Sequence, residues 1–259
     1  MSKLNLTLCQ SDLAWEDIDA NLNAFEKRFE SIKAKTDIII LPEMFSTGFS
    51  MEPFKIAENW PGRTMSWMKD NAQKYNCVLA GSIMVKVAER YLNRFVWVDP
   101  SGNIEFYDKR HLFQMGGEHE VFHAGSKQLI ISYKGWRIAP FVCYDLRFPV
   151  WSRNRNNYDL AIYVANWPAA RSHVWEKLLM ARAIENQCYV AGVNRVGIDG
   201  RDLFYDGNSL MINARGEVMS DFKKEKEEML TFEIDKADLL DFRNKFPVFD
   251  DADDFEIKL

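Results

Sequence analysis

The amino-acid sequence predicts a layered α/β domain with mixed sheets. Near the N-terminus, short apolar strands alternate with an amphipathic helix, which is the pattern of βα units. Further along, pairs of strands separated by short turns indicate antiparallel hairpins. No linker rich in Pro, Gly or Ser and no internal repeat divides the 259 residues. We therefore expect one domain over residues 1–259.

The first elements follow from apolar spacing. Leu4, Leu6 and Leu8 alternate with polar residues, which predicts a strand. Residues 37–41 form a β-branched run, typical of a buried strand. A helix is predicted between these strands, because apolar residues recur there at intervals of three and four. Its apolar face comprises Ile18, Leu22, Phe25, Phe29 and Ile32.

The middle of the chain predicts a helix and then strands. Residues 64–75 follow Pro61-Gly62 and are expected to be helical. Paired strands are expected at 78–85 and 91–99, and another at 104–108, after the turn that begins at Pro100. Residues 109–126 contain three glycines and no sustained period, so we expect a loop there.

The second half of the chain predicts further hairpins and helices. Lys134-Gly135 lies between strands expected at 128–133 and 137–142, and Ala214-Arg-Gly216 lies within a second hairpin. The remaining expected elements are a short helix at 149–156, a strand at 160–165, a helix at 172–187, strands at 188–196, 208–213, 217–220 and 229–234, and a helix at 235–243.

The composition excludes several classes of protein. Lys and Arg number 33 and Asp and Glu 38, a net charge of −5, which argues against nucleic-acid binding. The N-terminus has no apolar run typical of a signal peptide, and no stretch approaches the ~18 apolar residues of a membrane span. We therefore expect a cytoplasmic protein that binds no membrane. The four cysteines form no C-x-x-C pair, so no disulfide framework is expected.

A possible zinc motif occurs at His119-Glu-Val-Phe-His123, which matches H-E-x-x-H. That chemistry requires a helix long enough to place both histidines on one face. Here glycines lie close to both ends of the segment, which leaves room for about one helical turn. A third ligand is also needed, and neither His111 nor His173 lies at a recognisable spacing. We therefore expect no metal site and interpret these histidines as loop residues.

Three polar residues follow predicted strands. Each has a simple interpretation alone: Glu43 as a solvated carboxylate, Lys109 as a surface lysine and Cys143 as a packing residue. Cys143, however, lies between a strand and a turn, the geometry of a nucleophile elbow. Because ligand sites in α/β sheets favour the carboxyl ends of strands, the three side chains can converge at one edge.

In these motifs the sequence resembles the nitrilase, or carbon–nitrogen hydrolase, superfamily. Its Glu–Lys–Cys set matches Glu43 in Leu-Pro-Glu, Lys109 in Tyr-Asp-Lys-Arg-His-Leu-Phe and Cys143 in Cys-Tyr-Asp-Leu-Arg-Phe-Pro. The family carries a second glutamate, for which Glu118 fits best and Glu120 is the alternative. Within the superfamily, the segments 109–113, 165–171 and 206–209 look most like the YafV-type omega-amidases.

The resemblance implies a four-layer α-β-β-α sandwich that pairs into a homodimer or higher homo-oligomer. It implies hydrolysis of the terminal amide of 2-oxoglutaramate or 2-oxosuccinamate through a cysteine thioester, with no cofactor. Cys143 would be the nucleophile, Glu43 the general base and Lys109 the oxyanion-binding cation, held by Glu118. The alternatives are a carbamoylase, a nitrilase, or a catalytically silent binding protein. The signatures of papain-like proteases are absent.

The substrate pocket is less defined by the sequence. An arginine would suit a substrate carboxylate, and Arg171, Arg195 and Arg201 are candidates. Arg147 is expected to form structural ion pairs instead. Apolar walls could come from Phe113, Tyr144 and Trp167, although Trp167 is also compatible with ordinary core packing. Cys9, Cys77 and Cys188 are expected to be packing residues. The acidic tail, about 248–259, could remain solvated or dock on a partner subunit.

Overall fold

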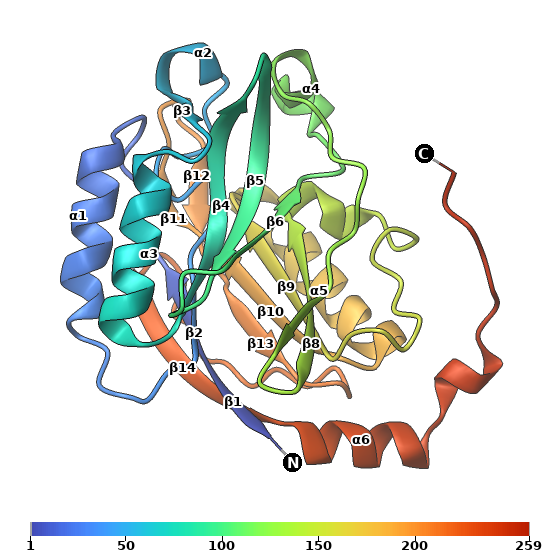
Figure 1. Ribbon diagram of the computed structural model, residues 1–259. Coiled ribbons are helices and arrows are strands. Elements are labelled where there is room, and N and C mark those ends of the chain that lie inside the picture. The colour runs from blue at the N-terminus through green and yellow to red at the C-terminus, as the bar shows by residue number, and fades with distance from the viewer. Residues whose placement is uncertain (1, 259) are drawn as a thin grey trace.

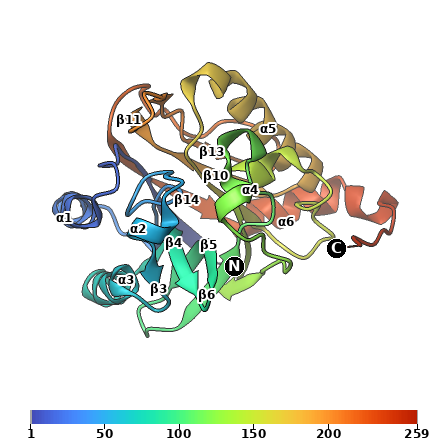
Figure 2. The same ribbon diagram turned by 90° about the horizontal axis from the view of Figure 1, so that it is seen from above.

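Two β-sheets lie face to face in the computed structural model, which describes residues 2–258 (Figure 1). Helices cover the outer face of each sheet, so the layers run α-β-β-α (Figure 2). This arrangement confirms the predicted four-layer α/β sandwich with mixed sheets.

The first sheet contains both parallel and antiparallel pairs. The strands β1, β2 and β4 run parallel, whereas β14, β5 and β6 add antiparallel neighbours at the two sides. The order across the sheet is β14 (Glu228–Asp235), β1 (Lys3–Gln10), β2 (Ile38–Ile40), β4 (Val78–Val87), β5 (Arg90–Val98) and β6 (Ile104–Asp108), and β3 (Glu58–Asn59) also pairs with β4.

The second sheet is built in the same mixed way. A parallel centre of β8, β9 and β10 is flanked by antiparallel β7 and β13. Its order is β13 (Leu210–Ile212), β10 (Tyr189–Asn194), β9 (Leu160–Ala165), β8 (Trp136–Val142) and β7 (Ile131–Tyr133), and β11 (Val196–Ile198) pairs with β12 (Phe204–Asp206) in a separate hairpin.

The helices complete the outer layers. On the first sheet lie α1 (Ile18–Phe29) and α3 (Arg63–Tyr75), and on the second lie α5 (Ser172–Asn186) and α6 (Lys236–Lys245) (Figure 2). The α1 helix begins where Asp17 caps the backbone N–H of Ala20, and its buried face carries Leu22, Phe25 and Phe29 of the predicted apolar residues. Ile18 is half-buried, and Ile32 lies beyond the end of the helix. Two single-turn helices are α2 (Pro53–Ile56) and α4 (Glu118–Val121).

Alternation along the strands divides the core into two parts. On β2, Ile38 and Ile40 belong to the core that includes the second sheet, whereas Ile39 belongs to the core beneath α1 and α3. Successive side chains of a strand point to opposite faces. Because both faces of this sheet are buried, its central strand is apolar throughout, as the sequence indicated.

One predicted helix is wrong. Residues 149–156 form turns, and the regular structure near them is a 3-10 turn at Cys143–Arg147. The side-chain oxygen of Asn154 accepts from the backbone N–H groups of Asn157 and Tyr158. Such side-chain bonds offer the backbone an alternative to helix formation. The predicted loop at 109–126 is largely irregular, and it contains α4 as a single turn.

The C-terminal tail leaves α6 and passes beside the body of its own chain (Figure 1). Val248–Asp251 form a 3-10 turn, and the guanidinium of Arg155 lies 4.4 Å from the ring centre of Phe255. Ile257 packs against the main core. The tail therefore contacts its own subunit, and its docking on a partner stays a prediction.

A buried carboxylate fastens α6 to the second sheet. Asp159, just before β9, is fully buried and contacts three cations. The distances to its oxygens are 2.9 Å from Arg137, 2.6 Å from Lys236 and 2.9 Å from Arg243. Burial alone would raise the pKa of Asp159, but hydrogen bonds from Arg137 and Lys236 outweigh it and lower the pKa to about 2.

We predict that Asp159→Asn lowers the free energy of unfolding at pH 7 by about 3–5 kcal/mol, because it leaves buried cations without their partner. The lowered pKa contributes about 2 kcal/mol, which is present above about pH 4 and is lost as the pH falls toward 2. Urea denaturation at pH 7 and between pH 4 and 2.5 should show a shallower pH dependence in the variant. Asp241→Asn, which loses an exposed pair with Lys245, is the matched control. Equal losses in both variants would contradict the prediction.

Candidate active site

Glu43, Lys109 and Glu118 meet in a buried cluster. The ammonium Nζ of Lys109 lies 2.8 Å from Oε1 of Glu43 and 2.8 Å from Oε2 of Glu118. All three residues are at most 1% exposed. The structure thus brings together the three charged residues that the sequence selected, and the second glutamate in contact is Glu118. Glu120 is exposed to solvent.

Strand ends place these groups together. Glu43 follows β2, Lys109 follows β6 and Cys143 follows β8, so residues from both sheets reach the same edge of the sandwich. The backbone N–H of Lys109 donates to the carbonyl of Asn93 on β5, which fixes where the lysine leaves the sheet. Glu118 arrives from α4, in the segment between the two sheets.

Cys143 occupies a tight turn. Its φ is 45°, in the left-handed region that is uncommon for residues other than glycine. The buried carboxylate of Asp145 holds this turn, since it accepts from the backbone N–H of Val142 at 3.0 Å and from the hydroxyl of Tyr107 at 2.7 Å. The ring of His111 lies 2.8 Å from the same carboxylate. This geometry matches the predicted nucleophile elbow.

Burial and charge control the protonation of the cluster. Burial alone would lower the pKa of Lys109, but the charges of Glu118 and Glu43 outweigh it and raise the pKa above its ordinary value. Burial raises the pKa of Glu118, and Lys109 offsets part of the increase. Burial and then the charge of Glu43 raise the pKa of the Cys143 thiol well above its usual range. The resting side chain of Cys143 is therefore a thiol, which would need a base to become a nucleophile.

Two asparagines that the sequence did not identify complete the cluster. Asn93 donates to Glu43 and to Glu118, and the backbone N–H of Asn166 donates to Oε2 of Glu43 at 2.9 Å. The carbonyl of Asn166 also lies 3.9 Å from Sγ of Cys143. Asn93 lies beside Arg94 on β5, and no local pattern distinguishes it in the sequence. Asn166 lies within a motif already noted.

A narrow pocket of about 60 Å³ opens above Cys143. Its walls include Phe113, Tyr144 and Trp167, as expected, and the ring centres of Phe113 and Tyr144 are 5.1 Å apart. Trp167 is 3% exposed, so it serves the core and the pocket together. The other lining residues are Phe49, Gly116, Arg147, Asn166, Pro168, Arg171, Asp199, Arg201, Leu203 and Tyr205.

Three arginines line this pocket. Arg171 lies over the ring of Phe113, and Arg201 donates to the carbonyl of Gly116. Within residues 2–258, neither these two arginines nor Arg147 has a carboxylate within ion-pair distance. Free guanidinium groups beside a nucleophile can bind an anionic substrate.

Two expectations about arginines are wrong. Arg147 makes no structural ion pair among the described residues, and its guanidinium lies 5.1 Å from the Trp167 ring centre, at the exposed edge of the pocket. Arg195 is fully buried and bonds to Asp12 at 2.7 Å and to backbone carbonyls, so it does not reach the pocket. The sequence placed both residues near the site, but it could not show which way their side chains turn.

The residues of the H-E-x-x-H motif do not form a metal site. His119 and His123 are both exposed, and α4 provides only one helical turn. Throughout residues 2–258, no three His, Cys, Asp or Glu side chains gather in a way that would hold a metal ion. In the same part of the chain, no helix has the length and apolar character needed to cross a bilayer.

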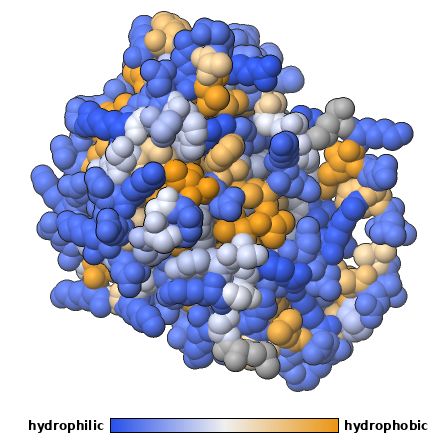
Figure 3. All heavy atoms as spheres, viewed as in Figure 1, coloured by the Kyte–Doolittle hydropathy of each residue, from blue (hydrophilic) through white to orange (hydrophobic). Residues whose placement is uncertain are grey.

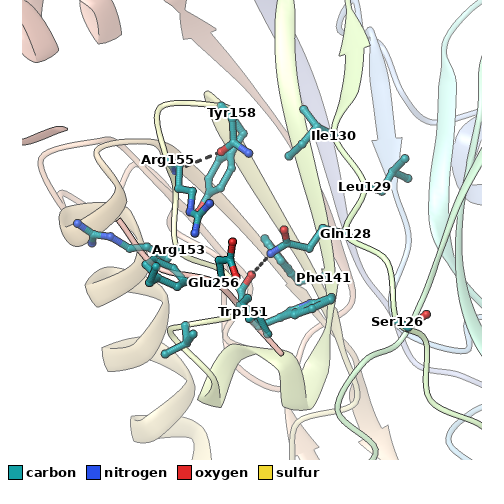
Figure 4. Close-up of a pocket in the computed structure, with 14 residues that line it drawn as sticks. Ser126, Gln128, Leu129, Ile130, Phe141, Trp151, Arg153, Arg155, Tyr158 and Glu256 are labelled. Atoms are coloured by element: carbon teal, nitrogen blue, oxygen red, sulfur yellow. Dashed lines mark hydrogen bonds between the residues drawn. The ribbon is translucent and has the colours of Figure 1, made fainter. Parts of the chain in front are cut away.

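A second hollow lies between residues 126–130 and the tail residues Phe255–Ile257 (Figure 4). Gln128 donates to the carbonyl of Trp151 along its wall. Figure 3 shows the molecule in the orientation of Figure 1. The face seen there is mostly hydrophilic, with apolar side chains gathered near its middle and beside the tail. None of the clustered residues Glu43, Lys109, Glu118 or Cys143 lines this hollow.

Comparisons with known proteins agree with this geometry. The carbon–nitrogen hydrolase family model matches residues 5–244. Omega-amidase YafV of Escherichia coli K12 is 48% identical over 99% of this chain and 100% of its own. A 2-oxoglutaramate amidase of Bacillus subtilis is 33% identical over 96% of this chain and 97% of its own.

A solved structure extends the match to three dimensions. A CN-hydrolase superfamily protein from Xanthomonas campestris, described with an arsenic adduct in its active site, superposes with a TM-score of 0.97. It is 41% identical, and the match covers all of both chains. The sequence, the fold and the buried cluster lead to the same assignment: this chain belongs to the carbon–nitrogen hydrolase family.

Proposed function

We propose that this protein is an omega-amidase, which hydrolyses the terminal amide of a small 2-oxo acid to a dicarboxylate and ammonia. The observation that carries the proposal is a buried thiol beside a Glu–Lys–Glu cluster, at the base of a pocket lined by free arginines. The omega-amidase of Escherichia coli and the 2-oxoglutaramate amidase of Bacillus subtilis support the choice of 2-oxoglutaramate as a substrate. We propose 2-oxosuccinamate as a second substrate, as the resemblance of the motifs implies.

The first half-reaction forms a thioester. Glu43 removes the proton of the Cys143 thiol as sulfur attacks the amide carbon. The carbonyl oxygen becomes negative and is stabilised by the ammonium of Lys109 and the backbone N–H of Tyr144. One such donor is worth ~3–4 kcal/mol in other hydrolases. Glu43 then returns the proton to the amide nitrogen, the carbon–nitrogen bond breaks, and ammonia leaves.

The second half-reaction consumes water. Glu43 removes a proton from a water molecule as its oxygen attacks the thioester carbon, and Lys109 again faces the oxyanion. The carbon–sulfur bond breaks, and the proton returns to Cys143. Glu118 keeps Lys109 in place and balances its charge. Apart from the substrate and water, the two half-reactions use only side chains and a backbone amide of this chain.

At the mouth of the pocket, we assign the substrate carboxylate to Arg171. Its side chain is half-buried over Phe113, whereas Arg147 and Arg201 are exposed. Partial burial strengthens a charged hydrogen bond, because the surrounding dielectric is lower. Phe113, Tyr144 and Trp167 would enclose the apolar methylenes of the substrate.

The wider organisation is also a proposal. We propose that residues 1–259 act as one catalytic domain, because residues from both sheets build the site. We propose a cytoplasmic location, which the four free cysteines support, and a homodimer, which the family resemblance implies.

Ammonia release from a substrate panel tests the reaction. We expect turnover of 2-oxoglutaramate and 2-oxosuccinamate, and little turnover of glutamine, a carbamoyl compound or a nitrile. Cys143→Ala, which removes the nucleophile, should abolish the release. Turnover of the carbamoyl compound alone would instead identify a carbamoylase.

Arg171→Ala should raise the KM for 2-oxoglutaramate by about 10–100-fold and change kcat little, because a hydrogen bond to a charged group is worth about 1.5–3 kcal/mol. Arg155→Ala, which lies over Phe255 away from the pocket, is the control. Steady-state kinetics of both variants measure the effect. An unchanged KM in Arg171→Ala would remove this residue from the proposal.

Iodoacetamide should label one thiol of the native protein, at Cys143. The other three cysteines are fully buried, whereas Cys143 is 9% exposed at the pocket. Glu43→Gln should slow the labelling, since the amide cannot accept the thiol proton. Mass spectrometry of timed digests gives the site and the rate. Equal labelling of several cysteines would contradict the proposed reactivity.

A further inference from the structure

Asn93 occupies the centre of the buried cluster, although it carries no charge. Its Nδ2 lies 2.8 Å from Oε1 of Glu43 and 3.1 Å from Oε1 of Glu118. Its backbone carbonyl accepts from the N–H of Lys109 at 3.0 Å. One residue of β5 therefore contacts both carboxylates and the backbone of the cation. It is 1% exposed.

The orientation of the Asn93 amide is determined by its partners. Its Oδ1 accepts from the hydroxyl of Ser82 at 2.9 Å, and that hydroxyl in turn accepts from the backbone N–H of Met44. The reversed amide would direct an oxygen at two carboxylates. Met44 directly follows Glu43, so this chain of hydrogen bonds also fixes the backbone that carries the base.

Lys109 and Asn93 close a ring with the two carboxylates. Each donates to Glu43 and to Glu118, so two donors alternate with two acceptors. Each carboxylate oxygen has two lone-pair positions. On Glu43, Lys109 and Asn93 occupy both positions of Oε1, whereas Oε2 receives Asn166 N–H and a longer contact of 3.4 Å from its amide. Oε2 therefore has one close donor where Oε1 has two, which makes Oε2 the oxygen better able to accept a proton.

We infer that Asn93 is a positioning residue for the general base: its amide holds both glutamates as carboxylates and turns Oε2 of Glu43 toward the thiol. A donor that bonds the charged form of a carboxylate favours that form. Without it, two buried carboxylates would face one ammonium, and one of them would take up a proton more readily. This inference rests on the proposed role of Glu43.

Other titratable groups surround the ring and are unaltered by the test. Cys143 faces it from the turn after β8. Tyr205 on β12 donates to Asp199. Burial, then Asp199, and to a smaller extent the charge of Cys143 raise the pKa of Tyr205. Arg195 lies over the ring of Tyr205. None of these groups bonds to the Asn93 side chain, so a change at Asn93 acts first on the two glutamates.

Alkylation of Cys143 by iodoacetamide tests this inference without any assumption about the substrate. In that reaction sulfur bonds to the methylene carbon, iodide leaves, and the thiol proton passes to Glu43. We expect Asn93→Ala to lower the alkylation rate by about 10–100-fold, the loss expected for charged hydrogen bonds. The acid limb of the rate–pH profile should move upward by about one pH unit. Asn93→Asp, which adds a third carboxylate, should move it further.

Asn71→Ala is the matched control. Asn71 is also a buried asparagine, but it bonds only to the carbonyl of Trp67 within α3, away from the site. Circular dichroism should show folded protein for each variant, and Asn93→Ser provides a smaller change if Asn93→Asp does not fold. An unshifted profile in Asn93→Ala and Asn93→Ser, or an equal shift in Asn71→Ala, would overturn the inference. If alkylation behaves as expected but no amide in the panel is hydrolysed, the proposed substrate fails and the positioning role stands.

Discussion

The burial of one ammonium between two carboxylates is the constraint on which the site depends. Removing charges from water is costly, and the cost is offset only by close partners with well-aligned hydrogen bonds. Lys109 has such partners in Glu43 and Glu118, at 2.8 Å each. Asn93 and Asn166 donate further hydrogen bonds to these carboxylates. Both sheets must therefore hold their edges in register, since the members of the cluster come from different strands.

This charge arrangement also explains the protonation of Cys143, the proposed nucleophile. The carboxylates outnumber the ammonium, so the thiol of Cys143 stays protonated until a base accepts its proton. The turn at Cys143 fixes the sulfur in place through a backbone conformation that Asp145 stabilises. A neutral thiol beside an anionic base suits a reaction in which charge develops on the substrate oxygen, next to Lys109. The arginines lie farther out, where they can meet an anionic substrate without joining the buried cluster.

Much of the fold followed from local patterns. The apolar alternation of β1, the helical spacing of α1 and the Lys134-Gly135 turn predict their elements because each depends on neighbouring residues. The predicted helix at 149–156 does not form, because the side chain of Asn154 bonds the backbone of its own turn and so favours a local structure other than a helix. The motifs around Glu43, Lys109 and Cys143 located the site, because residues that end strands of one sheet edge converge.

The sequence by itself determined the fold class, the family resemblance and two charged members of the cluster, Glu43 and Lys109, since spacing and motif carry that information. Tertiary structure decided the rest. Glu118 enters the cluster and Glu120 faces solvent because one short turn directs them differently. Arg195 pairs with Asp12, far away in the chain, whereas Arg147 has no ion-pair partner within residues 2–258. Asn93 contacts both glutamates only because the fold brings β5 beside two residues that are distant in the chain. Such partners are set by packing across the sheets, and no local pattern in the sequence records them.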